Sequence, residues 1–393
     1  MQPFFAQRFE KVEPSFIREI LKVAANPEII SFAGGLPNPH LFPVKAIEQA
    51  CQDVLREQGA AALQYATTEG FAPLRQFIAD RYLSRHGMTV NPDNILITSG
   101  SQQALDLLGK VLVNEGQDLI IEEPGYLGAI QAFSVYQPNF KPITLAEEGL
   151  DLAALDALLE QGSSARLLYG VPNFQNPSGV SYSRANREAL AERLVRHDLL
   201  MVEDDPYGEL RFEGEHLPPI AKLAPHNTVL LGSFSKTVVP AFRLGWMVVP
   251  EWLRKKVTIA KQATDLHSNA FSQQVLHRFL TDNSLDAHLE KIKEVYGRQR
   301  AAMEAALARH CPPGVSYTRP EGGMFLWLTL PPSVSAMALF DEAIKEKVAF
   351  VPGAPFYVRP EIQNTLRLSF SCVDEATTEE GVQRLCRALA RML

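Results

Sequence analysis

Residues 229–249 read VLLGSFSKTVVPAFRLGWMVV, and two short apolar runs in this stretch enclose a polar turn. The first run, Val229-Leu-Leu-Gly, precedes the turn, and the second, Gly245-Trp-Met-Val-Val, follows it. Runs this short and this continuously apolar are typical of strands that are buried on both faces of a sheet. The stretch therefore predicts two buried strands, with Lys236 just beyond the end of the first.

The same pattern recurs on the N-terminal side of this stretch, from about residue 94. Apolar runs alternate there with helix-like segments: residues 102–113 carry leucines at helical spacing, and residues 183–197 begin on a capping serine and have alternating charges. Such alternation is typical of a parallel sheet that helices cover on both faces. Four more strands are predicted, over residues 94–98, 118–122, 166–171 and 199–203.

The pattern changes after Phe271, where we expect a second structural unit. Residues 285–309 predict a long charged helix, and residues 324–330 predict a strand. Before the large unit, residues 14–25 predict a helix, and the Pro- and Gly-rich stretch 31–43 predicts a loop.

The composition excludes several classes of protein. Of 393 residues, 46% are hydrophobic and 21% are charged, which is typical of a globular chain. The formal charge of −7 has the wrong sign for a nucleic-acid-binding protein. No stretch reaches the roughly 18 apolar residues of a membrane span, and the first residues lack a cleavable signal. We therefore expect a cytoplasmic protein without nucleic-acid or membrane partners.

The cysteines predict neither a metal site nor a disulfide framework. Cys51, Cys311, Cys372 and Cys386 are far apart in the sequence, and no histidine lies at metal-ligand spacing from them. We expect them to be buried thiols.

The turn around Lys236 carries the sharpest chemical signal. Lys236 follows the hydroxyls of Ser233 and Ser235 and precedes Arg243. Hydroxyls and a guanidinium can hold a phosphate, and a lysine in such a cationic pocket is partly neutral, so that it can form a Schiff base with an aldehyde cofactor. Taken alone, the turn is more typical of an exposed lysine in a serine-rich turn.

Two further strand ends carry polar groups. Gly100-Ser101-Gln102 opens the helix over residues 102–113 and could present backbone N–H groups and a hydroxyl to an anion, or act as a plain N-cap. In Glu203-Asp-Asp-Pro-Tyr207, one carboxylate could accept a hydrogen bond from a protonated ring nitrogen. The alternative is a proline-terminated turn with solvated acids.

Three more side chains complete a ligand scheme. Asn176, held by Pro177, could donate to a phenolate oxygen on a planar ring, and Tyr126 could stack on that ring. Residues 365–370 alternate like a half-buried strand, and the planar fork of Arg367 suits a carboxylate as well as a salt bridge. A turn, surface packing and an ion pair are the respective alternatives.

With these residues in place, the chain resembles the fold type I aminotransferases that depend on pyridoxal 5′-phosphate (PLP), in particular the branch of 2-aminoadipate and kynurenine aminotransferases. The resemblance covers nearly the whole chain. Ser-x-Ser-Lys with an arginine seven residues after the lysine is specific by itself. The matching segments are residues 15–19, 34–39, 63–65, 98–106, 123–126, 175–179, 203–207, 233–236, 320–324 and 351–353.

The resemblance implies a cofactor role for most of these residues. Lys236 would link PLP covalently, and Asp204 would pair with its pyridine nitrogen. Asn176 and Tyr207 would hold the ring oxygen, and Tyr126 would stack on the ring. Lys236, Asp204 and Tyr207 would be the catalytic residues. The implied phosphate ligands are Ser101, Gln102, Ser233, Ser235, Arg243 and, reaching into the second subunit of a homodimer, Tyr65.

It also implies how substrate is held. Arg367, assisted by Asn176, would bind the α-carboxylate, and the loop with Gly35 would cover the substrate. Arg18 would receive a distal carboxylate, so we expect a broad range of L-amino acids (aromatic, aliphatic, glutamate or 2-aminoadipate) with 2-oxoglutarate as acceptor. The alternative for Arg18 is a solvent-facing position on a helix.

The implied fold is α/β, the PLP-dependent transferase fold type I, with a mostly parallel sheet in a large domain plus a smaller α+β domain. Residues 46–284 would form the large PLP-binding domain and residues 285–393 the C-terminal small domain. Residues 1–45, an N-terminal helix and the substrate-covering loop, would be part of the small domain.

The chain departs from the family pattern at two places, and two other functions remain as alternatives to an aminotransferase. Ser178 replaces a usual threonine, and Pro240-Ala-Phe242 replaces a usual Pro-Gly-Leu and adds bulk beside Arg243. PLP lyases or decarboxylases share the fold, but only a transaminase converts stoichiometrically to the pyridoxamine form. PLP-sensing transcriptional regulators carry a winged-helix module ahead of this pattern. Because the resemblance begins at residue 15, we expect an enzyme.

Overall fold

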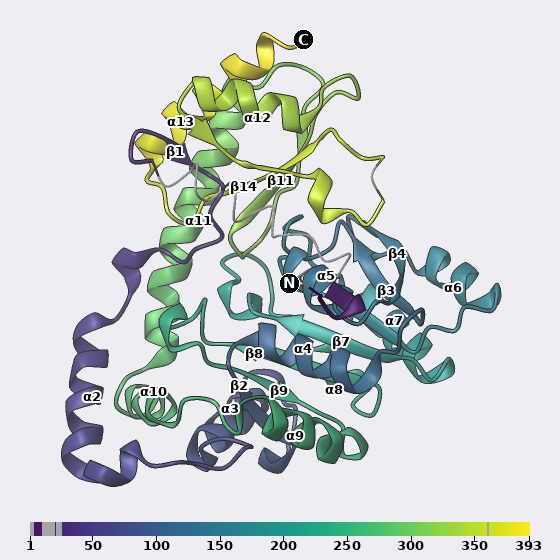
Figure 1. Ribbon diagram of the computed structural model, residues 1–393. Helices are drawn as coiled ribbons and strands as arrows, with labels where there is room; N and C mark the ends of the chain where they lie inside the picture. Colours follow the sequence, from purple (N-terminus) through teal and green to yellow (C-terminus); the bar gives the residue numbers. More distant parts are fainter. Residues whose placement is uncertain (1–3, 10–19, 21–25, 360) are drawn as a thin grey trace.

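The centre of the molecule is a sheet of eight strands in the part of the chain that the structure, a computed structural model, describes: residues 4–9, 20, 26–359 and 361–393 (Figure 1). The strand order is β2-β9-β8-β7-β6-β3-β4-β5. The neighbours from β8 to β4 are parallel, β9 is antiparallel to β2 and β8, and β5 is antiparallel to β4. The bounds are β2 (Ile95–Thr98), β3 (Asp118–Glu123), β4 (Asn139–Ala146), β5 (Gly149–Leu150), β6 (Leu167–Gly170), β7 (Leu200–Asp205), β8 (Thr228–Ser233) and β9 (Gly245–Val248).

Successive residues of the central strands face opposite layers of helices. Leu119 and Ile121 of β3 share a hydrophobic cluster with residues of α4 and α5, whereas Ile120 belongs to a second cluster with residues of α6, α7 and α8. Because side chains alternate along a strand, both faces of the sheet are buried, which is why the strand sequences are continuously apolar. The helices of this unit are α2 (Val44–Gln58), α3 (Ala72–His86), α4 (Ser101–Leu112), α5 (Leu127–Ser134), α6 (Leu152–Glu160), α7 (Arg184–Arg196), α8 (Ile220–Leu223), α9 (Glu251–Asp265) and α10 (Ala270–Asp282).

The predicted strands and helices of this unit are confirmed, and so is the fold class. The predicted strands correspond to β2, β3, β6, β7, β8 and β9, and the two predicted helices to α4 and α7. The Ser183 hydroxyl caps α7 by accepting a hydrogen bond from the N–H of Asn186. The strands β4 and β5, at one end of the sheet, lie outside these predictions. Ile143 is the one buried residue of β4, so that strand has no continuous apolar run, and β5 has only two residues.

A smaller unit lies above the sheet in Figure 1. It has a four-stranded sheet in the order β10-β11-β14-β13 and a separate parallel pair, β1 and β12, in which Ile30 lies beside Val348. The pair attaches the segment before α2 to this unit, while the domain boundaries at residues 45 and 284 stay predictions. The elements are β1 (Ile30–Ser31), α11 (Leu285–His310), β10 (Ser316–Tyr317), β11 (Phe325–Thr329), α12 (Ala336–Lys345), β12 (Val348–Ala349), β13 (Val351–Pro352), β14 (Thr365–Ser369) and α13 (Glu375–Ala390).

The expectation that the strand around Arg367 is half-buried is wrong. All five residues of β14 are buried. A segment far away in the sequence covers the second face, because the Arg367 guanidinium donates a hydrogen bond to the Ala33 carbonyl at 2.8 Å. A period-two pattern reports only polarity along the strand, so it cannot reveal a polar side chain that another segment buries.

The expectation of buried thiols is wrong for three of the four cysteines. Cys386 on α13 is buried, Cys51 and Cys311 are partly buried, and Cys372 is exposed. Cys372 lies in the turn that follows β14, and Cys311 comes directly after the end of α11, so both lie where an element gives way to a loop.

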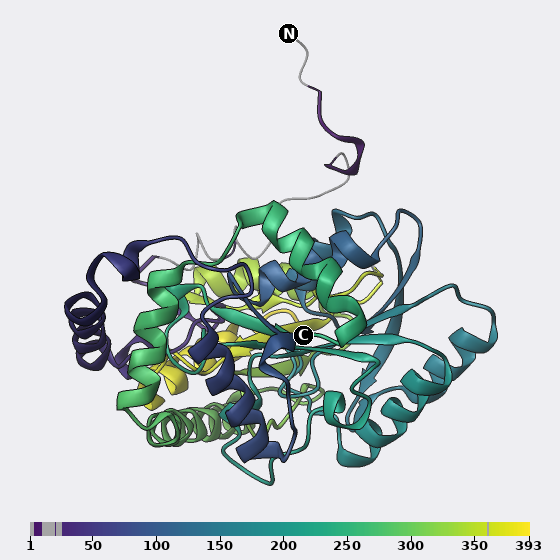
Figure 2. The same ribbon diagram turned by 90° about the horizontal axis from the view of Figure 1, so that it is seen from below.

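The N-terminal segment is described only in part. Residues 4–9 project from the body of the molecule with Phe4, Phe5 and Phe9 exposed (Figure 2). The helix predicted over residues 14–25 lies outside the described residues, apart from the buried Ile20. No described helix combines the length and the apolar composition that crossing a membrane requires.

Candidate active site

Lys236 follows the end of β8 in a turn that its own serines organise. The Ser233 hydroxyl accepts a hydrogen bond from the Ser235 N–H at 3.1 Å, and the Lys236 amine donates to the Gly35 carbonyl at 2.7 Å. Burial, and then the positive charge of Arg367, lowers the pKa of Lys236 from 10.5 to about 8. The amine is therefore partly neutral near neutral pH, as a carbonyl-attacking nucleophile must be.

The start of α4 forms a compact turn beside β8, the strand that leads to Lys236. Gly100 has a φ of 77°, and a Cβ on it would lie 2.5 Å from a guanidinium nitrogen of Arg243. A Cβ on Gly245 would lie 2.9 Å from the Ser101 backbone nitrogen, and Gly245 pairs with Ser233 of β8. Two glycines thus let a guanidinium, a helix N-terminus and the serine turn approach one another. This is a suitable setting for a phosphate.

Gln102 lies on the first turn of the same helix. Its side-chain amide donates to the Gly128 carbonyl at 2.9 Å, which connects α4 to the segment after β3. A Cβ on Gly128 would lie 2.6 Å from the Tyr126 ring, so that ring packs directly against the same segment. Burial raises the pKa of Tyr126 to about 12, which keeps its hydroxyl protonated.

The two adjacent aspartates at the end of β7 have different surroundings. Asp204 is 2% exposed, and one of its oxygens accepts a hydrogen bond from the Tyr169 hydroxyl at 2.9 Å. Its other oxygen, Oδ1, is buried without a hydrogen-bond partner among the described residues. Asp205 instead accepts from the Gly208 N–H at 2.8 Å.

An unpaired carboxylate oxygen in a buried site fits the expected cofactor. Burial raises the pKa of Asp204 to about 7, against the lowering effect of the Tyr169 hydrogen bond. A protonated ring nitrogen would give Oδ1 the donor that it lacks, and its positive charge would keep the carboxylate ionised. On this observation the residues at the end of β7 fit PLP.

Arg367, on β14 of the smaller unit, has no acidic partner among the described residues. The side chain donates to the Asn176 side-chain oxygen at 2.7 Å as well as to Ala33, and its Nε has no partner. The guanidinium lies 4.4 Å from the centre of the Phe325 ring. Burial lowers its pKa to about 10. No salt bridge uses this fork among the described residues, so it is available to a carboxylate.

Tyr207 and Gly35 lie next to this arginine. The Tyr207 ring contacts the Phe325 ring edge-on at 5.9 Å, and burial raises the pKa of its hydroxyl. A Cβ on Gly35 would lie 3.2 Å from the same phenylalanine and 3.9 Å from the Arg367 guanidinium. The segment of residues 33–35 therefore touches both Lys236 and Arg367 through its backbone.

Two expected site residues are not among these. Arg18 lies outside the described residues. Tyr65 is 80% exposed and packs edge-on against His267 at 5.8 Å, so within one chain it does not reach the turn at Gly100.

Sequence reasoning missed two residues that support the site. Tyr169 is embedded in a strand that looks purely apolar, and only its hydrogen bond to Asp204 on the neighbouring strand reveals it. Glu122 is buried and accepts from the Val171 N–H, the Gln175 amide and the Tyr182 hydroxyl. It thereby holds the segment that leads to Asn176. The signal that could have revealed Glu122 in the sequence is an acidic residue at the end of an apolar run.

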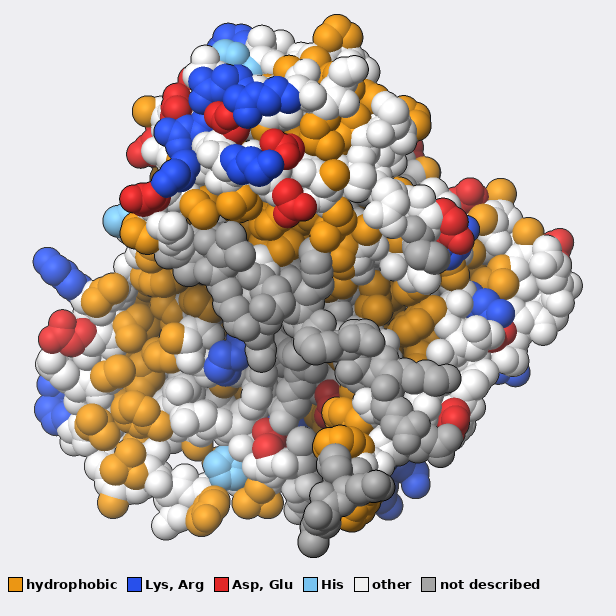
Figure 3. Space-filling model, turned by 45° about the horizontal axis from the view of Figure 1, so that its top comes forward, with side chains coloured by type: hydrophobic (Ala, Val, Ile, Leu, Met, Phe, Trp, Pro, Cys, Tyr) orange, Lys and Arg blue, Asp and Glu red, His pale blue; other side chains and the backbone are white. Residues whose placement is uncertain are grey.

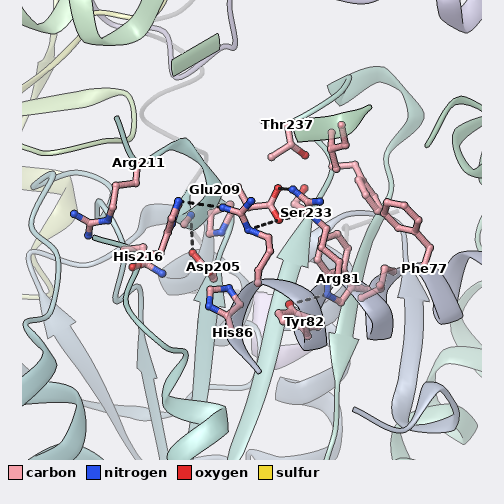
Figure 4. A pocket seen from close by; sticks show the side chains of 18 of the residues that line it. Phe77, Arg81, Tyr82, His86, Asp205, Glu209, Arg211, His216, Ser233 and Thr237 are labelled. Atoms are coloured by element: carbon pink, nitrogen blue, oxygen red, sulfur yellow. Dashed lines mark hydrogen bonds and ion pairs between the residues drawn. The ribbon is translucent and has the colours of Figure 1, made fainter. Parts of the chain in front are cut away.

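A small cavity of about 50 Å³ lies next to this constellation, and Figure 4 shows the side chains that line it. Asp205 and Thr237, the neighbours of Asp204 and Lys236, contribute to its lining. Arg81 and Glu209 form an ion pair there with an N–O distance of 2.5 Å. Ser233, a candidate phosphate ligand, also lines this cavity, so the cavity adjoins the candidate site.

Comparison with known proteins identifies the family. The family model "Aminotransferase class I and II" matches residues 29–385. The chain is 44% identical over 394 residues to a 2-aminoadipate transaminase of Thermus thermophilus, covering 99% of this chain and 97% of that protein. It is 40% identical over 393 residues to aromatic-amino-acid aminotransferase 1 of Thermococcus litoralis, covering 99% and 94%. Among solved structures, a kynurenine aminotransferase of Pyrococcus horikoshii in complex with PMP superposes with a TM-score of 0.95 at 42% identity, covering 99% and 98%.

Proposed function

This chain belongs to the class I and II aminotransferases, and on that premise we propose which substrates it takes and what its site residues do. The enzyme is a PLP-dependent aminotransferase of amino acids. PLP supplies an aldehyde and an electron-accepting pyridinium ring. The protein supplies the residues that bind, orient and exchange protons.

Lys236 is proposed to hold the aldehyde carbon of PLP and, once its amine is released, to take the proton from the substrate Cα. Its lowered pKa supports both roles, because a neutral amine is needed for each. Asp204 is proposed to keep the ring nitrogen protonated through its unpaired Oδ1. Asn176 and Tyr207 would hold the ring oxygen, and Tyr126 would cover the ring.

The phosphate is proposed to lie at the start of α4. The backbone turn at Gly100 and the approach of Arg243 support this assignment, because helix N–H groups and a guanidinium are the usual partners of phosphate. The proposed ligands are Ser101, Gln102, Ser233, Ser235 and Arg243.

Arg367 is proposed to bind the substrate α-carboxylate, with Asn176 assisting. The observation that carries this proposal is that a buried guanidinium, next to Asn176 and close to Lys236, has no acidic partner among the described residues. A buried cation without a counter-ion is unfavourable until an anion binds beside it.

The proposed amino donors are aromatic and aliphatic L-amino acids, glutamate and 2-aminoadipate, with 2-oxoglutarate as acceptor. The names of two relatives, a 2-aminoadipate transaminase and an aromatic-amino-acid aminotransferase, support a range that includes both side-chain classes. Arg18 is the proposed partner of a distal carboxylate, and this assignment rests on sequence resemblance.

We also propose a cytoplasmic homodimer with shared active sites. Exposed Phe4, Phe5 and Phe9 in an arm that leaves the body support a second copy as their partner (Figure 2). Hydrophobic side chains also gather on the left flank of Figure 3, the side on which α2 lies in Figure 1. Exposed residues of α2 and the following segment include Val44, Leu55, Leu63 and Tyr65.

A panel of amino acids tests the donor range. Each is mixed with the PLP enzyme in a single turnover without acceptor, and the loss of the imine absorption is recorded. A transaminase converts one equivalent to the pyridoxamine form, and 2-oxoglutarate then restores the PLP form. A lyase or decarboxylase would instead regenerate PLP without a 2-oxo acid.

Arg18→Ala should lower kcat/KM for dicarboxylic donors by about 10- to 150-fold and leave kcat/KM for leucine unaffected.

A further inference from the structure

An ion pair between a buried lysine and a partly exposed aspartate lies directly behind the turn that starts α4. Lys261, on α9, is fully buried, and its amine donates to both carboxylate oxygens of Asp265 at 3.0 and 3.1 Å. The same amine donates to the Gln103 side-chain oxygen at 3.1 Å and to the Ser268 hydroxyl at 3.0 Å. Every proton of the ammonium therefore has an acceptor within the protein.

The pair fixes the orientation of one side-chain amide. The Gln103 nitrogen donates to Asp265 at 2.6 Å, while its oxygen accepts from Lys261. Turning the amide over would place its NH₂ group against the ammonium and its oxygen against the carboxylate. Lys261 and Asp265 together thus permit a single orientation.

That orientation holds the backbone before the turn. The Gln103 oxygen accepts from the Ser99 N–H at 2.8 Å, and the Ser99 hydroxyl lies 3.2 Å from the Ser268 hydroxyl. The Ser99 carbonyl lies 3.5 Å from the Arg243 guanidinium. Ser99 is therefore held at its N–H, its hydroxyl and its carbonyl, one residue before Gly100.

We propose that Lys261, paired with Asp265, is a positioning residue for the phosphate-binding turn: through Gln103 it fixes Ser99 and hence the path of Gly100 and Ser101. This inference rests on the proposed phosphate site. Lys261 itself does not touch the phosphate. Since the negative charge of Asp265 balances the positive charge of Lys261, the pair acts on the turn through the geometry of its hydrogen bonds more than through its electric field.

Stability alone is a weak reason for such a pair. Replacing a buried ion pair by apolar residues is often neutral for the free energy of unfolding, because desolvation offsets the attraction. A pair that orients a hydrogen-bonding amide next to a ligand site has a specific consequence instead. The pair of Lys261 and Asp265 should influence the affinity of the protein for a phosphate group more than its free energy of unfolding.

The test compares PLP with pyridoxal, which lacks the phosphate. Apoenzyme is titrated with each, and the dissociation constant is measured by the imine absorption. Lys261→Met should weaken PLP binding on the order of 10-fold and leave pyridoxal binding unchanged. Gln103→Leu, which keeps the ion pair but removes its link to the Ser99 N–H, should do the same. The double variant should lose less PLP affinity than the two single losses combined, because both substitutions break the hydrogen-bonded path through Gln103.

Lys110→Met is the matched control. Lys110 also joins α4 to α9, since its amine donates to the Thr264 hydroxyl at 2.9 Å, but it lies far along the helix from the turn. This variant should bind PLP as the unchanged enzyme does. Inorganic phosphate, added as a competitor of pyridoxal 5′-phosphate, should be a weaker inhibitor of reconstitution in Lys261→Met and of ordinary strength in Lys110→Met.

Two outcomes would overturn the inference, and a third would overturn its premise. Equal losses for PLP and pyridoxal in both variants would show that the network only holds the fold. Unchanged PLP binding in either folded variant would show that the turn keeps its path without the hydrogen-bond network around Lys261. Arg243→Ala tests the premise separately: if it also fails to discriminate PLP from pyridoxal, the phosphate lies elsewhere.

Discussion

At the scale of single residues, the protonation of Lys236 controls when the enzyme can capture its cofactor. Below pH 8 the amine is mostly protonated, because burial has lowered its pKa only to about 8. The neutral fraction, and with it the rate of covalent PLP capture by the apoenzyme, should rise about tenfold per pH unit up to pH 8 and then level off. Stopped-flow recording of the imine absorption measures this profile.

The same experiment has a clear negative result. An ordinary lysine would keep gaining reactivity up to a pH near 10.5, so a profile without a plateau would contradict the assigned environment. Lys236→Ala is the control for the reacting group. It should still bind PLP through the phosphate contacts but yield no borohydride-trapped adduct and nearly no turnover.

The two aspartates of β7 allow a test of register. Asp204→Asn should slow removal of the substrate Cα proton by about 10²- to 10⁴-fold, because the ring nitrogen would lose its anionic partner. Asp205→Asn should have a smaller effect, since that carboxylate accepts from the Gly208 N–H on the other side of the strand. Single-turnover rates with deuterated substrate isolate this step. A larger effect at position 205 would reverse the assignment.

At the scale of elements, the turn between β2 and α4 depends on a residue without a side chain. Gly100→Ala would place a methyl group 2.5 Å from Arg243 in a backbone conformation that disfavours L residues. Arg243 must then move, and PLP affinity should fall at least 10-fold. Ser183→Ala is the contrasting variant: losing the cap of α7 should lower the free energy of unfolding by about 1 kcal/mol with PLP affinity unchanged.

The elements also show what sequence patterns can and cannot predict. The central strands are predictable because each is a short apolar run with a polar residue, such as Asp204 or Lys236, at or just beyond its end. Whether Arg367 would meet an acid could not be predicted, because its neighbours come from the distant segment at Ala33 and from Asn176. Tyr169 could not be predicted as a site residue for the same reason, since Asp204, its hydrogen-bond partner, lies on another strand.

At the scale of the whole molecule, Tyr65 tests whether active sites are shared. Tyr65→Ala and Lys236→Ala subunits, each impaired alone, should recover roughly a quarter of full activity when mixed in equal amounts and allowed to exchange. Half of the dimers would then be mixed, and each would contain one intact site. If Tyr65 served its own chain, mixing would restore nothing. Activity after denaturation and joint refolding decides between the two.

The pairing of β1 with β12 has a consequence for the order in which the enzyme is made. A ribosome adds about 5–20 residues per second, so Ile30 waits roughly 15–60 s for Val348 to be synthesised. The helix that packs on β1 arrives later still, with Gly381 set where a Cβ would lie 2.8 Å from Ile30. Until then the nascent chain already carries Lys236 but has no docked Gly35 carbonyl to accept a hydrogen bond from its amine and no Arg367 to receive a carboxylate. The substrate side of the site is therefore the last part of the enzyme to be completed during translation.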